Sequence, residues 1–306
     1  MKIAIIGRTE ILYDTALFLK ESGHEIVYIL TSEEAVEYKR TANDFKMLAE
    51  SLSVPFALGS DITKFSDELS ESNPDIGISM NYTGILPQSI IDIFPFGVLN
   101  SHGGDLPRYR GNACQAWAII NGEERIGLCI HKMIGGELDS GDIITRDYMP
   151  INHSTKVTKV WEWMSCRIPL LMLEAVEKLE ADPSYLLELQ SKSPQDFLRC
   201  YPRKPEDGRI TWSESARNVL RLVNASCKPY AGAFCGFEDR VMIIWDAELV
   251  LDDEIFCAVP GQVTNIGEGF IEVACGKGKL RLLEIEIDCV KKSPDTIIKS
   301  IRKRLS

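Results

Sequence analysis

The sequence predicts an α/β fold, a mostly parallel and doubly wound sheet, followed by a small β-barrel domain. Three observations predict it. Apolar runs of strand length alternate with helical patterns through the first half of the chain, which is typical of a parallel sheet. A proline-rich segment follows, and the remainder carries short apolar runs punctuated by glycine. No apolar run reaches the ~18 residues that a membrane span needs.

The first half opens with a strand at 2–6 and a helix at 10–22 that ends at Gly23. A helix over 32–52 is expected to be capped by Ser32. Further strands are expected at 25–30, 54–57, 75–80 and 97–102, and further helices at 62–70, 87–93, 113–121 and 155–179. Strands at 126–133 and 143–149 predict a hairpin that leaves the parallel sheet.

The second half is divided from the first by a linker. Prolines at 194, 202 and 205 place it at 191–207, between a domain at 1–190 and a domain at 208–306. After a helix at 213–225, short strands are expected at 231–237, 241–246, 261–263, 270–273 and 280–287. A helix over 295–305, with a basic, solvated face, is expected to close the chain.

Composition narrows the class of protein. The 306 residues fit about two domains. Nine cysteines without a CxxC pair, and no secretion signal, indicate reduced thiols in the cytoplasm, and no metal site is expected. The net charge of −11 argues against a broad electrostatic footprint for nucleic acid, although a few local arginines could still hold an anion.

The stretch from Phe96 to Asn112 carries the first sign of a site. Asn100 and His102 stand two apart where a strand enters a glycine-rich loop, so their side chains should project to the same side. Ligands of doubly wound sheets lie at such carboxyl ends of strands. On these two residues alone, a structural pair that satisfies loop backbone groups is an equal alternative.

Asp139 favours the catalytic interpretation. It lies in the turn at 134–142, and if the two turns meet it could orient His102 while Asn100 stabilises an oxyanion. No Ser or Cys stands in a GxSxG elbow, and Cys114 opens a helix whose spacing favours core packing. A base, an orienting group and an oxyanion donor without a protein nucleophile predict direct attack by a substrate amine on an acyl donor.

Three spaced motifs then resemble one family. Asn-x-His at 100–102, Leu-Pro-Arg-Tyr-Arg-Gly at 106–111 and Asp-Ser-Gly-Asp at 139–142 are together similar to the folate-dependent formyltransferases. Residues 201–212 and 229–234 resemble the C-terminal barrel domain of some members. The resemblance implies a Rossmann-like catalytic domain, an OB-like barrel, a homodimer, 10-formyltetrahydrofolate as formyl donor, and Asn100, His102 and Asp139 as catalytic residues.

The resemblance also implies binding residues. Those for the donor are Tyr82, Thr83, Gly84, Ile85, Leu86, Gly135, Gly136 and Asp142, although Ile85 and Leu86 could instead be core. Those for the acceptor are Arg8, Asn81, Gly103, Gly104, Arg108, Tyr109 and Arg110. Structural alternatives are a surface role for Arg8, and capping of loop carbonyls by Arg108 and Arg110.

The acceptor is expected to be a nucleotide-linked amino sugar. In the tRNA branch of the family a long basic insertion follows the second strand, whereas here residues 31–52 carry balanced charges. The main prediction is therefore formylation of a 4-amino or 3-amino dideoxysugar on a nucleoside diphosphate, for bacterial surface polysaccharide. Formylation of methionyl-tRNA is the alternative, and a non-catalytic scaffold that binds folate or a macromolecule is the second alternative.

Overall fold

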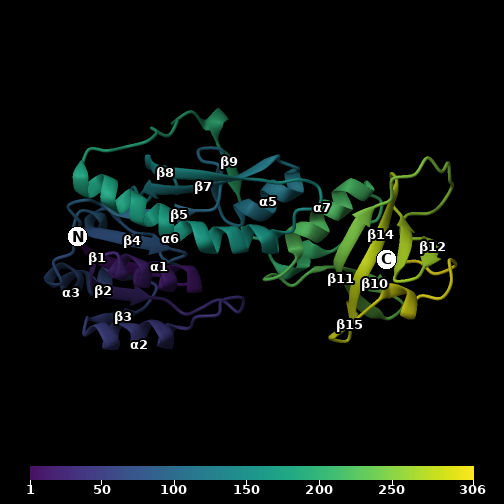
Figure 1. Cartoon of the computed structure of the whole chain (residues 1–306), viewed down its shortest axis with the longest axis horizontal. Helices are drawn as coiled ribbons and strands as arrows, with labels where there is room; N and C mark the ends of the chain where they lie inside the picture. The colour runs from purple at the N-terminus through teal and green to yellow at the C-terminus, as the bar shows by residue number, and fades with distance from the viewer. The chain divides into compact units, whose positions relative to one another are not determined.

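The computed structural model describes residues 1–306 and divides into two compact units, each described by itself below (Figure 1). The first unit comprises residues 1–111, 127–149 and 162–200. The second comprises residues 112–126, 150–161 and 201–306. No helix is both long and apolar enough to cross a bilayer.

The first unit is built on a seven-stranded sheet with the strand order β3-β2-β1-β4-β5-β7-β8. Its strands are β1 (Lys2–Gly7), β2 (Glu25–Thr31), β3 (Phe56–Leu58), β4 (Ile76–Met80), β5 (Val98–His102), β7 (Arg125–Lys132) and β8 (Ile143–Pro150). The strands from β3 to β5 are parallel, and the order reverses between β1 and β4. This reversal is the topological switch point of a doubly wound sheet, beside which ligands bind.

Burial explains why these segments are strands. The isoleucines of β1 and β4 are fully buried, as expected for strands covered on both faces. Helix α1 (Glu10–Glu21) packs on β1 and β2, and α2 (Ala42–Leu52) packs on β2 and β3. The remaining helical segments of this half are η1 (Ile62–Phe65), α3 (Ser66–Glu71), α4 (Gln88–Ile91), α6 (Val157–Ala181) and η2 (Pro194–Asp196).

The second unit centres on an antiparallel sheet with the order β10-β11-β14-β13-β12, and β15 pairs with β14. The strands are β10 (Ala233–Phe237), β11 (Arg240–Leu249), β12 (Val263–Gly267), β13 (Phe270–Ala274), β14 (Lys279–Ile287) and β15 (Val290–Lys292). Helices α5 (Cys114–Asn121) and α7 (Ala216–Ser226) belong to it, with η3 (Pro205–Gly208). An α/β unit with an antiparallel β domain after it confirms the predicted fold class.

Three local predictions are wrong. The helix expected over 32–52 begins only at Ala42, because Thr41 and Asp44 form a capping box there, while Ser32 is buried beyond the end of β2. The hairpin of β7 and β8 does not leave the sheet, since β7 pairs antiparallel with β5 and extends it. The pairing of β7 with β5 places His131 directly opposite Asn100.

The helix expected over 295–305 is also absent, and only the 3₁₀ turn η4 (Pro294–Thr296) forms. The last residues pair with the second unit's sheet instead. The Lys303 carbonyl accepts from the Val263 N–H at 3.1 Å, and the Ser306 N–H donates to the Gly236 carbonyl at 2.9 Å. Figure 1 shows the C-terminus among these strands. Tertiary pairing has overridden the local helical pattern.

Gly7, at the end of β1, allows a close approach that can be tested. Its φ is +137°, and a Cβ there would lie 2.0 Å from the Met80 carbonyl oxygen of β4. Gly23 is a matched control, because its φ is +96° and a Cβ there would meet no atom within 4 Å. Gly23→Ala should therefore lower the free energy of unfolding by about 1 kcal/mol, through backbone strain alone.

Gly7→Ala adds a backbone clash to the same strain, so it should lower the free energy of unfolding by about 3 kcal/mol or more. Urea unfolding followed by circular dichroism measures both values. Equal losses for the two variants would show that the approach of β1 to β4 is not as close as described.

Candidate active site

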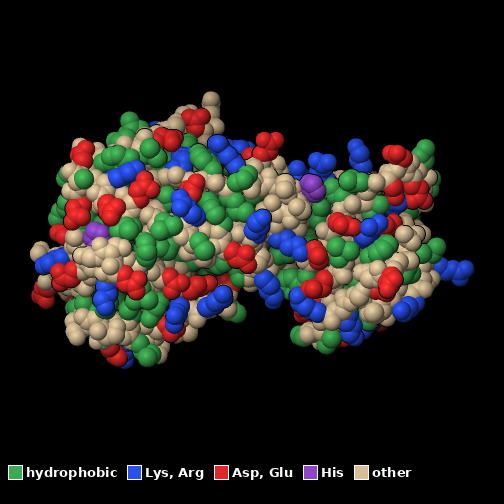
Figure 2. Space-filling model, in the orientation of Figure 1, with side chains coloured by type: hydrophobic (Ala, Val, Ile, Leu, Met, Phe, Trp, Pro, Cys, Tyr) green, Lys and Arg blue, Asp and Glu red, His purple; other side chains and the backbone are tan.

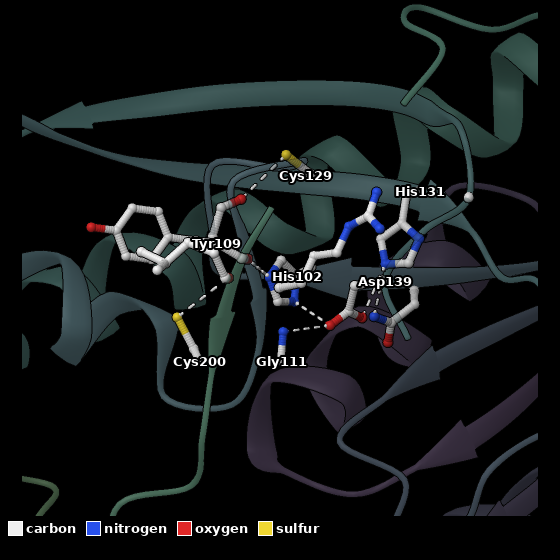
Figure 3. A network of polar contacts seen from close by, with 12 residues as sticks. His102, Tyr109, Gly111, Cys129, His131, Asp139 and Cys200 are labelled. Atoms are coloured by element: carbon white, nitrogen blue, oxygen red, sulfur yellow. Dashed lines mark hydrogen bonds and ion pairs between the residues drawn. The ribbon is translucent and has the colours of Figure 1, made fainter. Parts of the chain in front are cut away.

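The site is set by the antiparallel pairing of β5 with β7. Asn100 lies directly opposite His131, and His102 lies opposite Cys129. Residues directly opposite in an antiparallel pair share a face of the sheet, so these four side chains project to one side. Asn100 and His102 do lie on the same face, as the sequence predicts, and Figure 3 shows the imidazoles of both histidines converging on Asp139.

His102 is almost fully buried and faces an acceptor at each ring nitrogen. Its Nε2 lies 2.6 Å from the Tyr109 carbonyl oxygen, and its Nδ1 lies 3.5 Å from the Asp139 carboxylate. A carbonyl and a carboxylate can only accept, so the arrangement suits a ring that carries a proton on both nitrogens. Such an imidazolium can stabilise a developing negative charge and can release a proton.

Asp139 is held in the turn between β7 and β8 by several contacts. Its φ is +47°, a left-handed conformation that Asp tolerates better than most residues. The Gly111 N–H donates to its Oδ2 at 2.9 Å, and the Gln190 side-chain amide donates to its backbone carbonyl at 3.0 Å. Loop and turn therefore meet, as the sequence hypothesis requires.

The carboxylate of Asp139 is ionised despite its burial. Desolvation raises its pKa, but the charge of His102 and the hydrogen bond from the Gly111 N–H outweigh it. They hold the pKa of Asp139 well below its usual range. The site thus contains a fixed negative charge between two imidazoles.

His131 is the residue that sequence reasoning missed. It is 2% exposed, its Nε2 lies 3.1 Å from the Asn100 side-chain nitrogen, and the same atom lies 3.5 Å from Asp139 Oδ1. Its position one strand away from Asn100 follows only from the register of β5 with β7. A sequence reader who paired the strand at 126–133 with that at 97–102 could have found it.

The site contains no activated protein nucleophile. Cys129 lies beside it, but its Sγ points at the Gly104 carbonyl at 3.4 Å, and burial raises the pKa of its thiol to about 11. A thiol in that state is a poor nucleophile. Cys114, at the start of α5, is also buried. The geometry agrees with attack by a substrate group.

The residues expected to hold the formyl donor lie together. The Gly136 N–H donates to the Leu86 carbonyl at 3.2 Å, which joins the turn after β7 to the loop at 82–86. Leu86 is core, as its structural alternative proposes, whereas the Ile85 side chain is 77% exposed. A Cβ at Gly136 would meet nothing within 4 Å.

Other members of this set have structural partners. A Cβ at Gly84 would lie 2.2 Å from the Ser60 carbonyl oxygen, and one at Gly135 would lie 2.3 Å from the Gln88 nitrogen. Both glycines are therefore needed for chain packing. The Tyr82 hydroxyl donates to the Gly59 carbonyl at 3.0 Å, and the Asp142 carboxylate accepts from the Gln190 N–H at 3.3 Å. Thr83 is exposed.

The predicted acceptor contacts are spread more widely. Arg8 donates to the Glu33 and Asn81 carbonyls, and the Asn81 amide donates to the Tyr38 hydroxyl, so both bind the loop after β2. A second group lies nearer to Asp139: the Arg110 guanidinium stacks 3.6 Å from the Phe197 ring centroid and donates to Gln190. Of the rest, Gly103 and Gly104 form the loop after β5, Tyr109 is buried, and Arg108 is exposed.

Comparison with known proteins identifies the family. Residues 1–166 match the formyl transferase family model, and residues 203–300 match that of the formyl transferase C-terminal domain. The chain belongs to the formyltransferase family. It is a folate-dependent formyltransferase, as the motifs predict, and its formyl donor is 10-formyltetrahydrofolate.

Individual relatives refine the comparison. A methionyl-tRNA formyltransferase from Citrifermentans bemidjiense is 29% identical over 96% of this chain and 91% of its own length. An N-formyltransferase from Helicobacter canadensis, solved with folinic acid and dTDP-3-aminofucose, is 14% identical, with a TM-score of 0.69 over 92% of this chain and 99% of that one. HypX from Aquifex aeolicus, solved with tetrahydrofolic acid, is 18% identical, with a TM-score of 0.62 over 98% of this chain; this chain spans about half, 47%, of its length.

These findings correct the predicted acceptor. Five curated relatives that are 26–29% identical over 94–96% of the chain are methionyl-tRNA formyltransferases. The sugar N-formyltransferases resemble the chain at 14–18% identity, which shows a shared fold alone. The prediction of a nucleotide-linked amino sugar as acceptor is therefore wrong. That prediction relied on the absence of a basic insertion after the second strand. The absence of one loop does not show to which branch of the family a chain belongs.

The ionised Asp139 predicts a change of stability with pH. Because its pKa is lowered in the folded protein, its ionisation stabilises the fold above a pH of about 4 and ceases to do so as the pH falls through the lowered value. Asp139→Asn lacks this contribution. The free energy of unfolding of the parent protein minus that of the variant should thus decrease between about pH 5 and about pH 3.

Urea unfolding of both proteins across this range measures the difference. A difference that increases as the pH falls would contradict the assignment of a buried, ionised carboxylate.

Proposed function

We propose that this chain transfers the formyl group to the α-amino group of methionyl-tRNA. One observation carries the proposal: relatives with that activity in their names align with 94–96% of this chain and with 91–92% of their own length. The match includes both the catalytic part and the C-terminal part, so it is not limited to the chemistry that all formyltransferases share.

The charge distribution supports a nucleic-acid substrate better than the total charge does. From Arg203 onward the chain has 16 Lys and Arg and 16 Asp and Glu, so the whole net charge of −11 lies before that residue. Figure 2 shows positive and negative side chains interspersed over the C-terminal unit. A domain without net charge adds no long-range repulsion of the tRNA backbone. Arg217 and Lys228 are exposed, and each can neutralise one phosphate group.

The residues of the site divide the chemistry among them. The donor supplies a formyl carbon that is open to attack by the neutral amine. Asn100 donates an amide hydrogen, and the doubly protonated His102 adds positive charge, where negative charge develops on the formyl oxygen. Asp139 holds the imidazolium in place and stabilises it. His102 then gives a proton to the donor nitrogen as the bond from that nitrogen to the formyl carbon breaks, and the neutral ring or water takes the proton of the attacking amine.

The surroundings of the site offer an apolar contact for a ring face of the donor. The exposed Ile85 side chain and the open space at Gly136 lie on the two segments joined by the Gly136–Leu86 hydrogen bond. An exposed apolar side chain beside an unobstructed glycine is suited to contact the face of a heterocyclic ring. We assign Ile85 and Gly136 to the donor site on this basis.

A transfer assay tests the proposal. Protein is incubated with 10-formyltetrahydrofolate and methionyl-tRNA, and the amino acid released from the tRNA is analysed by mass for one added formyl group. Formylmethionine is expected, and its rate of formation should fall as salt increases, because phosphate contacts are screened. Uncharged tRNA and free methionine serve as controls and should not support comparable turnover.

A panel of nucleotide-linked amino sugars is tested in the same assay as competitors. Formylation of such a sugar, with no formylation of methionyl-tRNA, would overturn the proposed acceptor and leave the enzyme class intact.

The role of His102 is tested with His102→Asn. The variant retains a polar side chain but cannot carry a positive charge, so kcat should fall ~10²–10³-fold while the fold persists. Near-normal turnover by a folded variant would contradict the role given to His102.

A further inference from the structure

The geometry points to His131 as a positioning residue for formyl transfer, one that fixes the orientation of the Asn100 amide. The inference rests on the family's chemistry and on four residues of the first unit, Asn100, His102, His131 and Asp139. It does not depend on which amine accepts the formyl group.

The protonation of His131 follows from its own backbone. Its Nδ1 lies 2.9 Å from the Lys132 carbonyl oxygen, which can only accept, so Nδ1 carries a proton. In the neutral ring Nε2 then has a lone pair. The Asn100 side-chain nitrogen, 3.1 Å from Nε2, can only donate, so Nε2 accepts and the ring is neutral.

The lone pair determines which end of the Asn100 amide, the nitrogen or the oxygen, lies beside His131. The Nε2 of His131 lies 3.1 Å from Asn100 Nδ2, so the amide nitrogen donates one of its hydrogens to the ring. This contact turns the NH₂ group, rather than the carbonyl oxygen, toward the histidines. The second hydrogen on the same nitrogen is then available for the developing oxyanion, whereas a flipped amide would present an acceptor there and repel it.

His131 lies close to the catalytic histidine as well as to Asn100. Asp139 Oδ1 lies 3.5 Å from His131 Nε2, and Asp139 Oδ2 lies 3.5 Å from His102 Nδ1. The rings of the two histidines are 6.2 Å apart and nearly perpendicular. An unprotonated Nε2 cannot donate to Asp139, so loss of His131 should disturb the Asn100 amide and leave the contact of His102 with Asp139 in place.

Steady-state kinetics of two substitutions separate this role from simple packing. His131→Leu removes the acceptor and keeps an apolar volume, so kcat should fall about 10- to 100-fold because the amide loses its orientation. His131→Gln places a carbonyl oxygen near the former Nε2, so it should recover most of the lost activity. The KM for 10-formyltetrahydrofolate should change by less than about 3-fold in both, since His131 is not a donor contact.

A double-mutant cycle supplies the decisive comparison. If His131 acts through Asn100, then His131→Leu should cause little further loss in an Asn100→Ala background. His24 provides a matched control: it is a buried histidine of the same unit, its Nδ1 contacts the N-terminal amine, and His24→Leu should leave kcat unchanged. Losses that multiply in the double variant, or a His131→Gln variant as poor as His131→Leu, would overturn the inference.

Nuclear magnetic resonance gives a readout without turnover. In the unliganded protein with ¹⁵N-labelled histidine, the ring resonances of His131, assigned by their loss in His131→Gln, should show a neutral ring protonated at Nδ1. The proton of Nδ1 should exchange slowly. A ring protonated at Nε2 would overturn the inference. This result is independent of the acceptor, so failure to formylate methionyl-tRNA would not affect it.

Discussion

The site depends on one interaction, the placement of the Asp139 carboxylate between two buried imidazoles. An isolated ionised carboxylate would be costly at this depth, and it is tolerated because the His102 imidazolium and the Gly111 N–H face it. In the proposed mechanism, the same carboxylate stabilises the imidazolium that acts on the formyl group. Its position in turn requires a left-handed residue in the turn after β7 and a hydrogen bond from Gln190. The ionised Asp139 carboxylate, the turn after β7 and the loop at Gly111 therefore depend on one another.

The sheet determines what can surround that carboxylate. β5 pairs parallel with β4, one strand from the switch point, so its carboxyl end, with Asn100 and His102, lies at the end of the sheet where ligands of such folds bind. The antiparallel pairing of β7 with β5 then contributes His131 and Cys129 from the neighbouring strand, on the same face of the sheet. Only one of these two side chains is chemically useful, since the thiol of Cys129 is held in its neutral form by burial. The proposed chemistry therefore uses oriented donors and acceptors in place of a covalent step.

Much of this was predictable from the sequence, and the errors have physical causes. Asn100, His102 and Asp139 could be found because strand alternation and glycine-rich turns are local signals. His131 could not, because its place beside Asn100 depends on the register of two strands about thirty positions apart. The C-terminal segment has a helical pattern, yet pairing with the sheet near Gly236 and Val263 prevails over it. Arg8 and Asn81 stay predicted acceptor contacts, and both also bind the loop after β2, a contact that local sequence does not reveal. The acceptor itself was predicted wrongly because the argument relied on a missing loop, whereas similarity along the whole chain favours the tRNA branch.

The central claim is that oriented polar groups transfer the formyl group directly to the amine, with no protein nucleophile. Intact-protein mass spectrometry under single-turnover conditions tests it. The protein is mixed with 10-formyltetrahydrofolate carrying ¹³C in the formyl group, first alone and then with the acceptor. The account predicts that the protein mass stays unchanged at all times while the label appears in the product. A formylated protein that forms before the acceptor is added, and then passes its label to the product, would contradict the account.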